Sequence, residues 1–104
     1  MADAPAVVQR EGLVLAGPIT TATLGSIREY LLQHLEDPGT FLIHAHEVTE
    51  LDAEGAQLIG AFVNAVTRRA ATVRWVTVSP HLLAAARALG MEFWMGLSEP
   101  PWQR

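Results

Sequence analysis

The sequence contains no cysteine, which excludes disulfide scaffolds, thiolate zinc sites, cysteine nucleophiles and iron–sulfur clusters. Positive charge is also scarce, because seven basic side chains stand against 11 acidic ones, for a formal net charge of −4. A nucleic-acid binder needs clustered Lys and Arg to neutralise phosphates. The nearest approach to such a cluster, Arg68-Arg69 with Arg74, is thin. The composition therefore argues against nucleic acid as a partner.

Long apolar runs are absent too. No run approaches the roughly 18 consecutive apolar residues of a membrane-spanning helix, and Met1–Glu11 lacks the basic start and apolar stretch of a secretory signal. Half of the 104 residues are apolar and 17% are charged, which is too apolar for intrinsic disorder. We therefore expect one cytoplasmic domain over residues 1–104 without direct membrane insertion, with loose termini at 1–6 and 97–104.

The apolar pattern predicts strands that alternate with helices. Two short runs, 6–10 and 12–16, flank the turn-like pair Glu11-Gly12 and predict an antiparallel hairpin. Further strands are expected over 40–45 and 72–78, and helices over 20–35, 52–70 and 80–89. The tail 91–95 adds a last strand or a helical turn. The predicted fold class is α/β, with a mixed sheet of four to five strands and three to four helices.

Capping residues mark the ends of the three predicted helices, and each helix has an apolar face. Thr20 or Thr21 is expected to cap the first helix, Asp52 the second and Ser79 the third, where Pro80 follows at the first helical position. Gly90 is expected to close the third helix. The predicted core faces are Leu24, Ile27, Leu31 and Leu35; Leu58, Ile59, Phe62, Val63 and Val66; and Leu82, Leu83, Ala86 and Leu89.

Few residues suggest enzymatic chemistry. His44 and His46 leave the same face of a strand, but a metal site needs a third ligand, for which His81 or Glu47 would have to serve. Helix capping explains Ser79 beside His81, and neither a nucleophile elbow nor a phosphate-binding glycine loop is present. We predict no metal and no cofactor, and a small enzyme that uses the two histidines and Glu54 is the least supported alternative.

The segment Leu51–Gly55 is more informative, because it opens a helix directly after a buried strand. A helix N-terminus carries about half a positive charge and free N–H donors, so the acidic Glu54 fits there. The small residues Ala53, Gly55 and Ala56 favour close approach by another protein. An ordinary well-capped helix explains the same pattern.

These features together resemble the STAS family, named for sulfate transporters and anti-sigma-factor antagonists. The resemblance rests on Gly17-Pro18-Ile19, on the segment 41–55, on Ser79-Pro80 and on Leu89-Gly90-Met91, and it extends from about Val7 to Met95. It implies a non-enzymatic protein-binding module with a STAS-like α/β fold. In the anti-sigma antagonists of the family, a partner kinase phosphorylates a hydroxyl in the loop before the second long helix, and the phosphate breaks the complex.

The sequence departs from the family pattern at the phosphorylated positions. Asp52 and Gly55 are kept, but Ala53 and Glu54 stand where the hydroxyl residues would be, and His44 stands where an Asp is usual. This loop therefore has no phospho-acceptor, and Glu54 supplies one fixed negative charge as a partial imitation of the modified state. The resemblance implies a partner-binding loop of Asp52, Ala53, Glu54, Gly55 and Ala56, supported by His44, His46, Thr20, Thr21 and Ser79.

Two functions follow from the resemblance. The first is a constitutive anti-sigma antagonist-like regulator that binds a kinase-like anti-sigma factor or a chemosensory protein. The second is a STAS subunit bound to the ATPase of a lipid-transport ABC system. The aromatic tail with Phe93, Trp94, Met95 and Trp102 either completes the core or forms a homodimer contact.

Overall fold

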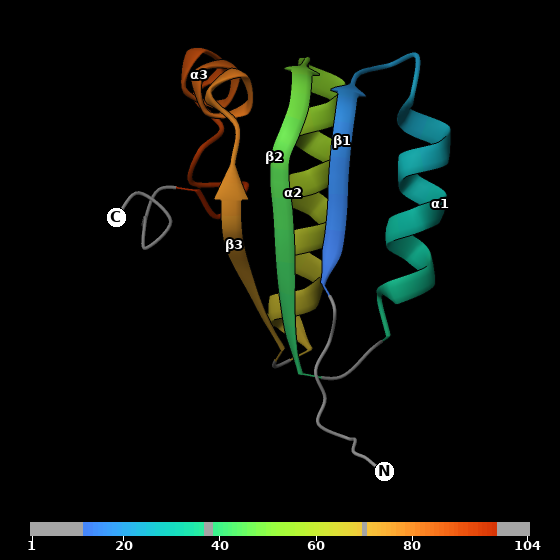
Figure 1. Cartoon of the computed structure of the whole chain (residues 1–104). Helices are drawn as coiled ribbons and strands as arrows, with labels where there is room; N and C mark the ends of the chain where they lie inside the picture. The colour runs from blue at the N-terminus through green and yellow to red at the C-terminus, as the bar shows by residue number, and fades with distance from the viewer. Residues whose placement is uncertain (1–11, 37–38, 70, 98–104) are drawn as a thin grey trace, which may run out of the picture.

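The computed structural model describes residues 12–36, 39–69 and 71–97. Three strands and three helices alternate along them: β1 (Leu13–Ile19), α1 (Leu24–His34), β2 (Thr40–Leu51), α2 (Ala53–Arg68), β3 (Thr72–Val78) and α3 (Pro80–Leu89) (Figure 1). The strands form a parallel sheet in the order β1-β2-β3. The α/β class and the parallel pairing are therefore confirmed. The described residues contain three of the four to five predicted strands, and the predicted strand 6–10 lies outside them.

The core lies between the sheet and α2, which crosses one face of it (Figure 1). Every second residue in the first half of β2, namely Phe41, Ile43 and Ala45, points into this layer and is buried. The Phe41 ring packs edge-on against Phe62 of α2, with the ring centroids 5.5 Å apart. α1 lies beside β1 and α3 near the end of β3, so the described helices leave the other sheet face uncovered.

β2 is longer than predicted, because the strand continues through residues 46–51 to Leu51 rather than ending at Ala45 in a loop. Its pairing with β1 contains two β-bulges, and each inserts one extra residue into β2. Beyond Ala45 the buried positions are therefore three residues apart, at Val48 and Leu51, with two exposed residues between them each time. Alternation with period two cannot reveal such a strand from sequence.

The helix starts confirm two of the three predicted caps. Asp52 and Ser79 accept hydrogen bonds from the backbone N–H three residues ahead, and Gly90 ends α3 at φ 69°. The cap predicted at Thr20 or Thr21 is wrong, because α1 begins at Leu24 and Thr23 is the N-cap residue. The Thr23 hydroxyl instead donates to the Pro18 carbonyl at 2.8 Å, so it closes the β1–α1 loop rather than the helix.

The chain after α3 folds back as a turn over residues 92–96. Met95 is fully buried, and its carbonyl accepts a hydrogen bond from the Trp75 indole at 2.9 Å. Phe93 is 85% exposed, so Met95 completes the core and Phe93 does not. Leu89, predicted in the core, is 39% exposed at the last turn of α3. Trp102 lies outside the described residues.

Candidate functional site

Asp52 joins the start of α2 to the loop that follows β1. One carboxylate oxygen, Oδ1, accepts the Gly55 N–H at 2.8 Å and thereby caps the helix. The other, Oδ2, accepts the Thr21 N–H at 2.9 Å and the Thr21 hydroxyl at 3.2 Å. The Asp52 N–H donates to the Ile19 carbonyl at 3.2 Å. We call this arrangement of Asp52, Gly55, Thr21 and Ile19 the Asp52 clasp.

Hydrogen bonding in the clasp favours the charged carboxylate. The N–H of Gly55 and then the N–H of Thr21 hold the pKa of Asp52 below its usual value of 3.8, against a smaller opposing effect of desolvation. An ionised carboxylate at the positive end of α2 is also favoured by the helix dipole. Both carboxylate oxygens of Asp52 are therefore used in hydrogen bonds that join the start of α2 to Thr21 in the loop after β1.

Gly55 and Ala56 serve internal packing. Gly55 is buried, and a Cβ atom at this position would overlap the carbonyl oxygen of Ile19 and lie 2.9 Å from its carbonyl carbon. Ala56 is fully buried as well. Gly55, which was associated from sequence with close approach by a partner, instead allows α2 to approach the molecule's own β1.

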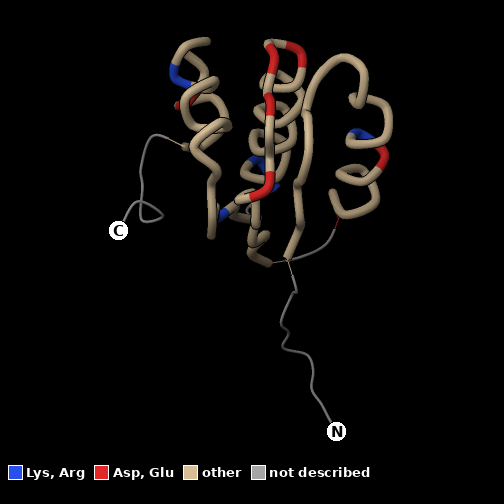
Figure 2. Tube along the Cα trace, turned by 45° about the horizontal axis from the view of Figure 1, so that its top comes forward, with Lys and Arg blue, Asp and Glu red and all other residues tan. Residues whose placement is uncertain are grey.

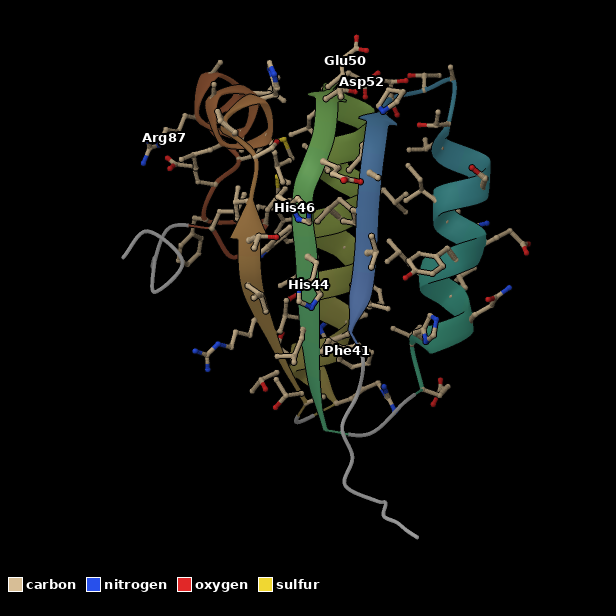
Figure 3. All side chains as sticks on the ribbon, viewed as in Figure 1. Phe41, His44, His46, Glu50, Asp52 and Arg87 are labelled. Atoms are coloured by element: carbon tan, nitrogen blue, oxygen red, sulfur yellow. The ribbon has the colours of Figure 1, made fainter. Side chains whose placement is uncertain are left out.

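The outer surface at this end of the sheet is acidic. Within residues 52–56, only Ala53 and Glu54 are exposed. Exposed Glu47 and Glu50 precede them, and Figure 2 shows acidic residues following the second half of β2 into the first turn of α2. Glu50 and Asp52 stand at the same end of the sheet in Figure 3. We call the exposed residues Glu50, Ala53 and Glu54 with Thr21 the α2-start face.

The two histidines lie elsewhere. Both project from the sheet face that faces away from α2, well below Asp52 in Figure 3. His44 pairs with Val14 and Leu51 with Ile19, so five strand steps, roughly 17 Å, separate His44 from the end of β2. His46 contacts the Thr77 hydroxyl through Nδ1 at 3.2 Å and lies 3.8 Å from Glu47. The structure does not bring either histidine to the α2-start face.

Ser79 supports the sheet from inside. It is 2% exposed, accepts the Leu82 N–H at 3.0 Å and donates its hydroxyl to the Val48 carbonyl at 2.7 Å. The same residue donates its N–H to the Ala45 carbonyl at 3.0 Å. Ser79 therefore caps α3, as predicted, and also binds the carbonyls of Ala45 and Val48 in β2, a second role that its sequence position did not suggest.

The contact between Thr21 and Asp52 was not predicted from the sequence, although Thr21 was expected to support the loop. Thr20 is partly buried beside Thr23, whereas Thr21 is exposed and bound to Asp52. One signal could have indicated the contact: β1 and β2 are parallel, so their carboxyl ends, followed by Thr21 and Asp52, meet at the same edge of the sheet. The described residues contain no group of three or more His, Cys, Asp or Glu able to hold a metal ion. No helix in that part of the chain is long and apolar enough to cross a bilayer.

Comparison with known proteins shows the family to which this chain belongs. The family model described as "Mlab, STAS domain" matches residues 4–96, nearly the whole chain. The protein therefore belongs to the STAS domain family. Neither the curated proteins nor the solved structures provide a match.

Proposed function

We propose that the protein is a non-enzymatic binding module that recognises a protein partner through the α2-start face, without a phosphorylation switch in residues 52–55. Membership of the STAS family supports a regulatory module that acts by protein interaction. The site residues support the absence of a switch at this loop, because Ala53 and Glu54 offer no hydroxyl.

The proposal rests on one observation: within residues 52–56, three residues hold the start of α2 in place and two are exposed. Asp52, Gly55 and Ala56 are used by the clasp and the packing beneath it, and this fixes the start of α2. Ala53 and Glu54 are left exposed on that fixed support. A rigid, preorganised surface loses little entropy when it binds, which favours its use as a recognition face.

Two partner classes agree with this face. One is a kinase-like anti-sigma factor or chemosensory protein, which the likeness to anti-sigma antagonists suggests. The other is the ATPase of a lipid-transport ABC system. The description of the matching family as "Mlab, STAS domain" favours the second class. In either complex, Glu54 presents a constant negative charge, so the partner surface opposite it is expected to be basic.

The test is affinity capture of the tagged protein from its native lysate, with bound proteins identified by mass spectrometry. An ABC ATPase or an anti-sigma factor should be recovered, and the identity of the protein decides between the two classes. Glu54→Arg should weaken binding of the purified partner about tenfold or more, because it places like charges opposite each other.

Glu29→Arg is the matched control, since Glu29 is exposed on α1. It makes the same change of net charge away from the α2-start face and should leave the affinity nearly unchanged. Equal losses in both variants would show that only the overall charge matters and would refute the proposed face. Addition of ATP and the partner should leave the complex intact, whereas ATP-driven release through residues 52–55 would contradict the proposal.

A further inference from the structure

An apolar groove of about 170 Å³ lies between α1 and α2. Leucines and small residues line it, namely Leu31, Leu32 and Leu35 from α1, and Leu58, Ala61 and Ala65 from α2. Leu32 is 49% exposed, and Ala61 is exposed as well. Apolar surface that gathers in an exposed groove is typical of an interaction site.

Hydrogen bonds at both ends hold the two helices in register. Before α1, the Thr21 N–H donates to Asp52 at the start of α2 at 2.9 Å. At the other end, the Arg69 guanidinium directly after α2 donates to the carbonyls of the two residues that follow α1. The helices therefore run in the same direction, and Leu32 and Ala61 line the groove near its middle.

The outer face of α2 carries opposite charges at its two ends. Exposed Glu54 lies seven residues before Ala61, and exposed Arg68 lies seven residues after it. Seven residues are nearly two turns of an α-helix, so the three side chains share one face. If two copies of α2 cross antiparallel at Ala61, a two-fold rotation relates them and sets Glu54 of each copy opposite Arg68 of the other. Alanine at the crossing point allows the helices to approach closely.

α1 repeats this arrangement with the order of the charges reversed. Exposed Arg28 lies four residues before Leu32, and exposed Glu36 lies four residues after it. The same two-fold rotation therefore brings Arg28 of one copy near Glu36 of the other, while Leu32 of both copies meets at the centre. Glu36 also lies 3.3 Å from Arg69 of its own chain, and a carboxylate can accept from both. An apolar centre with a charged rim is the usual composition of a specific interface.

We propose that this surface binds a second copy of the chain in an antiparallel, two-fold contact. We call it the α1–α2 face and define it as Arg28, Leu32, Glu36, Glu54, Ala61 and Arg68. Two adjacent helices, the longer of 16 residues, present about 24 Å by 20 Å, so the dimer buries roughly 1,000 Å² in total. This area is at the lower end for specific contacts, so a dissociation constant on the order of 10–100 μM is expected. The inference is independent of the partner proposed above, because Leu32 and Arg68 lie outside the α2-start face.

The test is sedimentation velocity of the full chain at concentrations from about 5 to about 500 μM, where the parent should form a dimer. Leu32→Glu should weaken the dimer about tenfold or more, because it places two like charges at the apolar centre. Leu89→Glu is the matched control, since Leu89 is 39% exposed on α3, away from α1 and α2 (Figure 1), and should dimerise like the parent. A monomeric parent, or equal dimerisation of the two variants, would overturn the proposal.

Charge reversal tests the pairing between the copies. Glu54→Arg and Arg68→Glu should each weaken the dimer about tenfold. The double variant, and an equimolar mixture of the two single variants, should dimerise like the parent, because opposite charges again face each other. A double variant as weak as the single ones would overturn the antiparallel contact. If the dimer is absent but Glu54→Arg still weakens partner binding and Arg68→Glu does not, the proposed function stands without this contact.

Discussion

Replacement of Gly55 by alanine tests the packing beneath the α2-start face. In an open helix this change stabilises by up to about 1 kcal/mol, because alanine has the better helix propensity. Here the new methyl group overlaps the Ile19 carbonyl oxygen and lies 2.9 Å from the Ile19 Cγ2 atom. The overlapping atom belongs to the backbone and accepts the Asp52 N–H, so relief requires α2 to move away from β1.

The gain in helix propensity and the cost of the overlap together allow an estimate of how Gly55→Ala changes the stability. Overpacking that forces the backbone to shift costs about 1–3 kcal/mol or more. We therefore expect Gly55→Ala to lower the free energy of unfolding by about 2 kcal/mol after its propensity gain, and the thermal midpoint by about 10 °C. The measurement is urea unfolding followed by circular dichroism, with differential scanning calorimetry for the midpoint.

Gly25→Ala is the matched control, because Gly25 is exposed on α1 and a Cβ atom there meets nothing within 4 Å. This variant should be as stable as the parent or about 0.5 kcal/mol more stable. The reasoning fails if Gly55→Ala unfolds at or above the parent temperature. A bulky Gly55 variant is consequently a folding variant, and loss of partner binding in it would say nothing about the interface.

Three further predictions concern the clasp, the buried cap and the C-terminal turn. Because folding lowers the pKa of Asp52, the stabilising effect of this carboxylate should be present above about pH 4 and lost as the pH falls through its pKa in the folded protein. The thermal midpoint of Asp52→Asn should therefore fall less steeply with acid than that of the parent, and parallel plots of midpoint against pH would contradict this. Ser79→Ala should cost about 2–3 kcal/mol in urea unfolding, because it leaves buried polar groups unpaired, whereas exposed Ser26→Ala should change stability by less than about 0.5 kcal/mol. Met95→Ala should cost about 2–5 kcal/mol. Phe93→Ser should leave stability within about 0.5 kcal/mol of the parent and leave dimerisation through the α1–α2 face intact in sedimentation, while loss of the dimer would identify this turn as the contact.

Local signals in the sequence were sufficient for several elements. Thr72–Val78 alternates β-branched residues and forms β3 with the predicted bounds. The third helix has a serine cap, a proline at its first position and a closing glycine, and all three features are present in α3. Such features depend on neighbours within one turn of the chain, so they can be inferred without the fold.

The α/β class, the family resemblance, the Asp52 cap and the lack of a hydroxyl at positions 53 and 54 all follow from the amino-acid sequence alone. The remaining features of the site depend on contacts between residues that are far apart in the sequence. The path of β2 to Leu51 depends on bulges set by its pairing with β1, and the need for glycine at position 55 depends on a carbonyl 36 residues earlier in the chain. The link between Thr21 and Asp52 likewise spans 31 residues. Contacts of this kind leave no local periodicity, because they arise only when the carboxyl ends of two parallel strands are brought to the same edge of the sheet.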